Sequence, residues 1–257
     1  MTDHILVERE QGLLTLRLNR PDKLNALTRA MYSRLADALT EAGQDPTVRA
    51  VLIAGSDTCF TSGNDVEDFL KVPPSSLDSP VFHFMRALFE LSKPVVAAVA
   101  GPAVGIGTTL LLHCDLVYVS RDARLKMPFV NLGLCPEFGS SLILPRLLGQ
   151  ARAAELLLLG EGFSGEQAAA WGIALEALDD GPATLARARE RALRFLELPP
   201  AAVADSKRLM RAPGREELRR VITEEGELFG QRLRSPEAVE ALSAFLQRRK
   251  PDFSRFA

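Results

Sequence analysis

Residues 93–118, KPVVAAVAGPAVGIGTTLLLHCDLVY, decide which fold the rest of the chain can adopt. Positions 94–114 carry no formal charge, and a run of that length could cross a membrane as a helix. Glycines and a proline interrupt the run in its middle, and an aspartate follows it directly, so we do not expect a membrane span. The stretch instead predicts a buried strand over 94–101, a glycine-rich turn, a buried helix and a second strand over 115–120.

The sequence before this stretch continues the alternation of strand and helix. Apolar residues follow a helical spacing from Thr28 to Gly43, and VRAVLIAG (48–55) predicts another buried strand. Helices between buried strands are typical of parallel crossovers, so we expect an α/β core. The other elements expected here are strands at Ile5–Val7 and Leu13–Leu18, a loop at Ser75–Pro80 and an amphipathic helix over 80–92.

Beyond about Leu142 the strand signals stop and helical patterns follow one another. This shift in composition divides the chain into an expected core over residues 1–195 and a C-terminal helical region over 196–257. The segments with helical spacing are 151–160, 165–172, 182–197, 200–211, 215–233 and 236–249.

The bulk composition narrows the class of protein. The chain has 257 residues, a net charge of −2 and a pI near 6.0, which argues against a nucleic-acid or anionic-membrane surface over the whole molecule. Its three cysteines have no paired spacing, which fits a reducing compartment better than a disulfide framework. The N-terminal residues do not have the pattern of a signal peptide, so a cytoplasmic location is expected.

Two expected strands each run into a loop that contains glycine, SDTCFTSGNDVEDF (56–69) and PAVGIGTTL (102–110). In open α/β sheets, ligands bind at the carboxyl ends of strands, where glycines let the backbone N–H groups approach them. The second loop lacks the lysine of a P-loop and the spacing of the dinucleotide motif. The three histidines are too dispersed for a metal site, and no serine nucleophile is indicated, so backbone N–H donors are what these loops offer.

The segment LGLCPEFGSS (132–141) contains one acid, Glu137, and no other charged residue lies between Lys126 and Arg146. Taken alone, the segment favours a structural acid in the first turn of a helix, facing the helix dipole. The alternative is a base whose pKa is raised by apolar surroundings. Two loops of N–H donors and one carboxylate suit proton abstraction next to a carbonyl, with the enolate oxygen held by the donors.

Four segments together resemble the crotonase (enoyl-CoA hydratase/isomerase) superfamily, and they occur in the family's order over nearly the whole chain. They are NRPDKLNAL (19–27), FTSGNDVEDF (60–69), residues 93–118 and FSGEQAAAWGI (163–173). The resemblance implies a spiral of ββα units and a C-terminal helical region that forms a homotrimer or a dimer of trimers. It also implies a coenzyme A thioester as substrate, with no further cofactor and no metal. By position, the two N–H groups that hold the thioester oxygen would be those of Ser62 and Ile106.

The resemblance also indicates the reaction. Hydratases of this family use two glutamates, and this sequence has Thr109 and Phe129 at those positions, so two-acid activation of water is not supported. The family's Δ3,Δ2-enoyl-CoA isomerases use one glutamate in a segment similar to NLGLCPEFGSS (131–141), which implies Glu137 as the base that converts 3-enoyl-CoA into 2-trans-enoyl-CoA. Phe138 replaces the family's usual small residue, and we expect it to narrow the acyl pocket or to keep water from the base.

The same resemblance implies a set of substrate contacts. Lys23 would meet a phosphate of coenzyme A or remain solvated, and Leu24 and Ala26 would offer backbone contacts to the adenine. The residues implied at the substrate are Lys23, Leu24, Ala26, Ser62, Gly63, Asn64, Asp65, Val66, Gly105 and Phe138.

Several polar residues have a structural interpretation as well. Asp65 is expected mainly as a cap on a helix over 66–70, and Asp115 as an oriented structural acid. The basic group Arg248–Lys250 would contact a phosphate on a neighbouring subunit's ligand or simply end a helix in solvent.

Two other functions remain open from the sequence. One is a crotonase-fold enzyme that acts on another acyl-CoA, such as a residual hydratase or an isomerase of an aromatic pathway. The other is a trimeric scaffold without catalytic activity, which the near-neutral charge and the intact combination of acid and loops disfavour.

Overall fold

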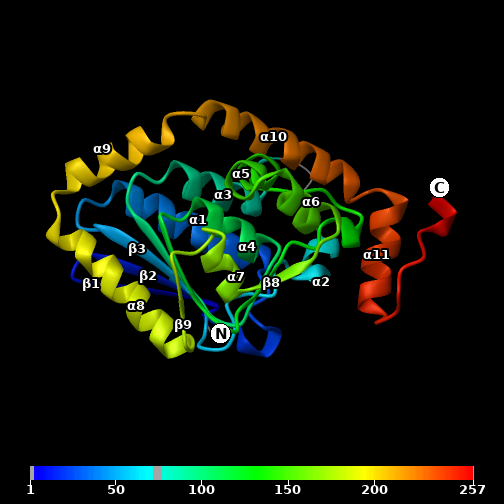
Figure 1. Ribbon diagram of the computed structural model, residues 1–257, viewed down its shortest axis with the longest axis horizontal. Coiled ribbons are helices and arrows are strands. Elements are labelled where there is room, and N and C mark those ends of the chain that lie inside the picture. The colour runs from blue at the N-terminus through cyan, green and yellow to red at the C-terminus, as the bar shows by residue number, and fades with distance from the viewer. Residues whose placement is uncertain (1–2, 72–76, 257) are drawn as a thin grey trace.

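The computed structural model describes residues 3–71 and 77–256 as two β-sheets surrounded by helices (Figure 1). The larger sheet has six strands in the order β1-β2-β3-β4-β6-β9. Its first two strands form an antiparallel hairpin, and every later pair is parallel. The strands are β1 (Ile5–Glu10), β2 (Leu13–Leu18), β3 (Ala50–Ala54), β4 (Val95–Val99), β6 (Leu116–Ser120) and β9 (Glu176–Leu178). The predicted α/β core is therefore confirmed.

A second sheet of three short strands lies beyond the carboxyl end of β4. It consists of β5 (Pro102–Val104), β7 (Arg124–Lys126) and β8 (Gly162–Ser164), in that order. The prediction that strands cease beyond Leu142 is wrong at β8 and β9. Both have three residues, which is too short for the alternation of polar and apolar positions that marks a strand in sequence.

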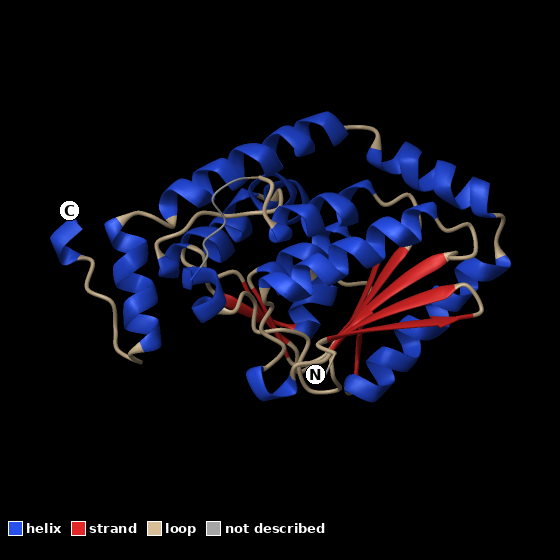
Figure 2. Ribbon diagram, turned by 180° about the vertical axis from the view of Figure 1, so that it is seen from behind, coloured by secondary structure: helices blue, strands red, loops and turns tan. Residues whose placement is uncertain are grey.

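Helices cover both faces of the larger sheet, and viewed from behind its strands fan out beneath them (Figure 2). Central strand β3 is buried on both faces, as expected for a parallel strand between two helical layers. On one face, Val51 and Ile53 belong to a core that includes residues of α1 and α3. On the other face, Leu52 packs with Ala188 and Ala192 of α8.

The helices begin and end close to the positions predicted from the sequence, and several begin at side-chain caps. Thr28, Ser164, Asp180 and Ser235 each accept a hydrogen bond from a backbone N–H in the first turn that follows. The α-helices are α1 (Arg29–Gln44), α2 (Val66–Lys71), α3 (Pro80–Glu90), α4 (Ile106–Thr109), α5 (Ser140–Leu148), α6 (Gln150–Leu158), α7 (Gly165–Ala170), α8 (Gly181–Arg194), α9 (Pro200–Arg211), α10 (Arg215–Arg232) and α11 (Pro236–Leu246). The 3-10 turns are η1 (Pro21–Lys23), η2 (Leu110–His113), η3 (Val130–Leu132), η4 (Phe195–Glu197) and η5 (Ser254–Phe256).

Part of the loop predicted at Ser75–Pro80 lies outside the described residues, which resume at Leu77, and α3 begins at Pro80. Within the described part of the chain, no helix is long and apolar enough to cross a membrane.

The C-terminal helices form an arch over the rest of the molecule, with α9 and α10 along the top in Figure 1. Asp115 holds the C-terminal half of α9, where it binds Lys207 and Arg211 at 2.7 and 2.8 Å. Asp115 also accepts the N–H of Val95 at 2.8 Å, so the arch is tied to the start of β4. The interpretation of Asp115 as an oriented structural acid is confirmed. Phe229 of α10 belongs to the main hydrophobic core, so this helix packs on the same core as the sheet.

Candidate active site

The two glycine loops lie side by side. The N–H of Val104 donates to the carbonyl of Thr61 at 3.0 Å, and the N–H of Thr61 donates to the carbonyl of Pro102 at 2.9 Å. Gly63 has a φ of +91°, and a Cβ added there would lie 2.8 Å from the carbonyl oxygen of Val104. Glycine is therefore required at position 63, because any side chain would push the two loops apart.

Each of the two loops, as far as the structure describes them, contributes an N–H group without an assigned acceptor. Ile106 is the first residue of α4, so its N–H has no partner inside the helix. Within residues 3–71 and 77–256, neither the N–H of Ile106 nor that of Asn64 has an assigned acceptor. The N–H of Ser62, in contrast, donates to the carbonyl of Leu24 at 2.9 Å. The prediction that Ser62 supplies an oxyanion donor is therefore wrong, because the turn before Asn25 already occupies that N–H.

Glu137 is buried beside α4. Glu137 as a whole residue is 6% exposed, and its carboxyl group accepts a hydrogen bond from the hydroxyl of Thr109, the last residue of α4. Burial raises the pKa of Glu137 to about 8, the bond from Thr109 opposes that rise, and the charge of Glu225 adds to it. The interpretation of Glu137 as an acid in the first turn of a helix is wrong, since α5 begins at Ser140.

Tyr32 of α1 connects Asn64 with the neighbourhood of Glu137. Its hydroxyl donates to the side-chain oxygen of Asn64 at 2.5 Å, and its ring packs at 5.6 Å from that of Phe84. Burial raises the pKa of Tyr32 well above its usual value, and the charge of Glu137 raises it further. The buried Tyr32 thus links the half-buried Asn64 to the neighbourhood of the buried Glu137.

Phe138, the residue after Glu137, is held in place by His113. Phe138 has a φ of +56° and stacks on the ring of His113, with the ring centroids 3.7 Å apart. Nε2 of His113 lies 2.7 Å from the carbonyl oxygen of Phe138. Burial lowers the pKa of His113 to about 3, so the ring is neutral and donates through Nε2–H. The Phe138 ring is fully buried, and its effect on the acyl pocket and on water near Glu137 remains a prediction.

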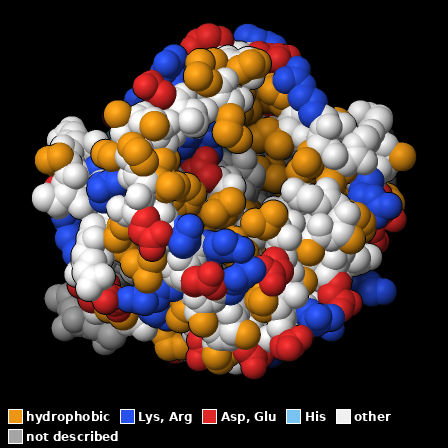
Figure 3. Space-filling view, turned by 60° about the vertical axis from the view of Figure 1, so that its left-hand side comes forward, with side chains coloured by type: hydrophobic (Ala, Val, Ile, Leu, Met, Phe, Trp, Pro, Cys, Tyr) orange, Lys and Arg blue, Asp and Glu red, His pale blue; other side chains and the backbone are white. Residues whose placement is uncertain are grey.

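A cavity of about 390 Å³ lies between α5 and the turn that joins α9 to α10. Its walls are mostly apolar, and His113 connects it to the loop of Glu137 through the stacked Phe138 ring. Figure 3 shows a hollow of this kind on one face of the molecule, with apolar side chains around it and basic groups near its rim. The basic residues that line the cavity are Arg146, Arg211 and Arg215.

Comparisons with known proteins show to which family the chain belongs. Residues 8–255 match the family model described as enoyl-CoA hydratase/isomerase. The chain belongs to the enoyl-CoA hydratase/isomerase family. It is therefore an enzyme of that family, and the predicted crotonase-type fold is confirmed.

Relatives of this enoyl-CoA hydratase/isomerase family member include two proteins named as isomerases. The chain is 37% identical to 1,2-epoxyphenylacetyl-CoA isomerase of Escherichia coli K12, over 99% of both chains. It is 34% identical to human enoyl-CoA delta isomerase 2, over 95% of this chain and 64% of that protein.

Solved structures with the same fold include OdaA of Pseudomonas aeruginosa, which is 71% identical with a TM-score of 0.95 and covers 96% of this chain and 100% of that one. An enoyl-CoA hydratase/isomerase of Pseudoalteromonas atlantica T6c is 38% identical with a TM-score of 0.92, over 98% and 100% of the two chains.

Among the residues that the family resemblance implied at the substrate, Asp65 has a structural role. It accepts the N–H of Asp68 at 2.9 Å, which caps α2, and it binds Arg20 at 2.6 Å. Burial alone would raise the pKa of Asp65, but these bonds hold it below its usual value. The prediction of a helix cap is confirmed. Val66 begins α2 and is half-buried against the core, and Gly105 precedes α4 with a φ of +57°.

The turn at residues 20–27 lies against the first glycine loop, with Lys23 and Leu24 exposed. The carbonyl groups of Leu24 and Ala26 already accept bonds from Ser62 and Arg20 inside the chain, while contacts of this turn with coenzyme A remain predictions. A residue that the sequence reasoning missed, Asn25, joins the two segments. Its buried amide donates to the carbonyls of Cys59 and Phe60 at 3.0 and 3.1 Å. Its only signal in the sequence is its place in the segment NRPDKLNAL (19–27).

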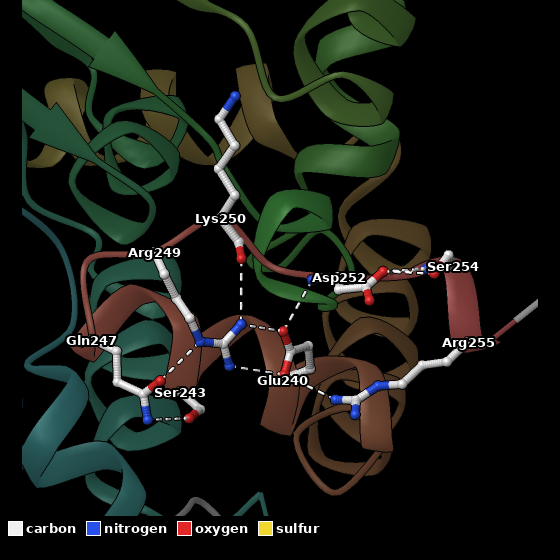
Figure 4. Close-up of polar contacts among 8 residues, drawn as sticks. All are labelled: Glu240, Ser243, Gln247, Arg249, Lys250, Asp252, Ser254 and Arg255. Carbon is white, nitrogen blue, oxygen red and sulfur yellow. Dashed lines mark hydrogen bonds and ion pairs between the residues drawn. The ribbon is translucent and has the colours of Figure 1, made fainter.

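In the C-terminal basic group Arg248–Lys250, Arg249 forms an ion pair within the chain. Arg249 binds both oxygens of the buried Glu240, and Arg255 binds the same carboxylate at 2.9 Å (Figure 4). The hydrogen bonds from Arg249 are the main reason why the pKa of Glu240 falls to about 2. Arg249 therefore anchors the C-terminal segment, whereas the side chain of Lys250 points away from this cluster (Figure 4).

Proposed function

We propose that this enzyme converts 3-enoyl-CoA thioesters into 2-trans-enoyl-CoA with Glu137 as its single base. The observation that carries the proposal is the burial of Glu137 against the hydroxyl of Thr109. The positions at which the family's hydratases have glutamates are held by Thr109 and by the buried Phe129. One buried carboxylate with a raised pKa supports a proton shift, and the lack of a second acid at those positions argues against hydration.

In the proposed reaction, Glu137 removes a proton from C2 of the substrate and the double bond moves into conjugation with the thioester. The N–H groups of Asn64 and Ile106 hold the oxygen of the resulting dienolate. Each such donor contributes roughly 3–4 kcal/mol to the transition state in other enzymes. The carboxylic acid then returns the same proton to C4, so no atom is gained or lost and Glu137 ends as a carboxylate.

A second candidate is the isomerisation of another acyl-CoA, such as that of an aromatic pathway. It is favoured by the 37% identity to the protein named 1,2-epoxyphenylacetyl-CoA isomerase, over 99% of both chains. The same base and the same backbone donors would serve an aromatic acyl group.

The test uses 3-hexenoyl-CoA and follows the conjugated product with time, for the wild type and Glu137→Gln. We expect the variant to lose about 10²- to 10⁴-fold in kcat. Glu161→Gln, which removes an exposed carboxylate elsewhere, should keep the wild-type rate. Hydration of crotonyl-CoA at a rate comparable to isomerisation, or an active Glu137→Gln variant, would contradict the proposal.

The family resemblance further supports a homotrimer or a dimer of trimers, a cytoplasmic location and a substrate that carries its own coenzyme A, without metal, nucleic acid or membrane. Sedimentation velocity of the purified protein tests the assembly. A monomer at micromolar concentration would contradict it.

A further inference from the structure

Glu225 of α10 contacts the backbone that carries Glu137. The residue is 7% exposed, and its carboxylate accepts a hydrogen bond from the N–H of Gly139 through one oxygen and from the N–H of Ser141, at 2.9 Å, through the other. These donors lie at the start of α5, where N–H groups have no partner within the helix and a negative charge is favoured. The acid at the N-terminus of α5 is therefore Glu225 of α10, which lies 86 positions after Gly139 in the chain.

The turn held in this way has an unusual backbone. Phe138 and Gly139 have φ angles of +56° and +75°, and such a conformation of a phenylalanine persists only when its surroundings hold it. A Cβ added to Gly139 would lie 2.4 Å from the side chain of Leu218, so α10 packs directly on the turn. His113 binds the carbonyl of Phe138 from one side and Glu225 binds the N–H of Gly139 from the other.

We propose that Glu225 is a positioning residue for the base, because its carboxylate fixes the turn that directs the carboxyl group of Glu137 at the hydroxyl of Thr109. The proposal rests on the role of Glu137 as base in the proposed function. A cap that served only the stability of α5 would need no particular relation to Glu137, whereas here the capped turn and the base are consecutive in the chain.

The charge of Glu225 gives the proposal a second consequence. The polar groups that shift the pKa of Glu137 are Thr109 from α4 and Glu225 from α10, while the charge of Glu137 in turn raises the pKa of Tyr32 and of Cys135. Glu225 is the acid among them, and its charge raises the pKa of Glu137. Burial raises the pKa of Glu225 itself above its usual value, the hydrogen bonds from Ser141 and Gly139 oppose that rise, and the charge of Glu224 adds to it. Neutral His113 adds no charge to this region.

Three variants separate position from charge. Glu225→Gln removes the charge with little change in shape, and Glu225→Asp keeps the charge but withdraws the carboxylate by one carbon. The matched control is Glu224→Gln, which removes a charge from the same helix where the side chain is 71% exposed and pairs with Arg220. For each variant, kcat and KM for 3-hexenoyl-CoA are measured against pH, together with the melting temperature and the assembly state.

For Glu225→Gln we expect kcat to fall by about 10- to 100-fold with KM within about twofold, because a displaced base loses rate rather than binding. The acid limb of the pH profile should move to lower pH, since the charge that raises the pKa of Glu137 is gone. For Glu225→Asp the limb should stay near its wild-type position while kcat falls. Glu224→Gln should match the wild type.

Wild-type kcat and an unmoved limb in Glu225→Gln would overturn the proposal. So would a loss of activity that follows the melting temperature alone. Should Glu225→Gln fail to fold, Glu225→Asp decides, and a wild-type kcat in that variant would also overturn it. Carbon-13 NMR of glutamate-labelled protein, with the signal assigned by Glu137→Gln, follows the titration of Glu137 without substrate. A lower pKa in Glu225→Gln supports the proposal even if the substrate class is wrong, and an unchanged or higher one contradicts it.

Discussion

The hydroxyl of Thr109 donates a hydrogen bond to the carboxylate of Glu137, so a neutral donor stands where the family's hydratases have an acid. This contact is the one influence on Glu137 that favours its charged form, against burial and the charge of Glu225. It therefore sets how much of the base is ionised at a given pH.

Thr109→Val should raise the pKa of Glu137 further, because the bond that lowers it is lost. We expect the acid limb of kcat/KM to move to higher pH and the rate at pH 7 to fall roughly tenfold, since a hydrogen bond to a charged group contributes about 1.5 kcal/mol or more. Thr109→Ser keeps the hydroxyl and should retain the wild-type limb. An unmoved limb in the valine variant would show that this bond does not control the base.

The wild type should be more active in mildly alkaline than in neutral solution. Glu137 removes a proton only when it is ionised, and its pKa is raised to about 8. Below that value kcat/KM should rise about tenfold per pH unit, and above it the rate should level off. Initial rates with 3-hexenoyl-CoA between pH 6 and 9 test this. A profile that is already flat from pH 6 would mean that the base ionises near its ordinary value.

Gly63→Ala should lower kcat by about 100-fold, the usual effect of losing one oxyanion donor, because the new Cβ would press on Val104 and move the N–H of Asn64. Gly149→Ala is the matched control, since Gly149 also has a positive φ, of +78°, but nothing lies within 4 Å of its added Cβ. Both substitutions strain the backbone, at a cost of about 1–3 kcal/mol each. Equal activity in the two variants would argue against a role for the Gly63 loop in catalysis.

Asp115→Asn should destabilise the protein by about 3 kcal/mol, because it leaves the buried Lys207 without its counter-ion. Burial already lowers the pKa of Lys207 to about 8, and Asp115 opposes that effect. Asp205→Asn on α9, the helix that carries Lys207, breaks an exposed ion pair with Arg208 and should cost less than about 1 kcal/mol of stability. Urea unfolding of both variants measures the difference, and similar losses would show that the Asp115 cluster is not an anchor.

Much of the fold could be predicted from the sequence because its strands and helices are long enough to show their periods. The buried run at residues 94–101 appears as β4, and the predicted helix over 200–211 appears as α9 with the same bounds. Strands β8 and β9 escaped prediction because three residues carry no period.

The candidate site, like the fold, could be predicted from the sequence only in part. The glycine loops and the isolated acid Glu137 could be found from composition and spacing, but only the family resemblance implied that Glu137 is the base. Which N–H of the loop is open could not be found in this way, because it depends on the pairing of Ser62 with Leu24 across the fold. Glu225 was hidden for a similar reason. On α10 it is one acid among several, and only the folded chain brings it to Gly139.

The link between Glu225 and Gly139 also has a consequence for biosynthesis. A nascent chain that has left the ribosome only as far as Leu148 contains the base, its turn and both glycine loops, but not the carboxylate that receives the turn's N–H groups. Premature termination or proteolytic loss of the last fifth of the protein therefore removes an internal support of Glu137.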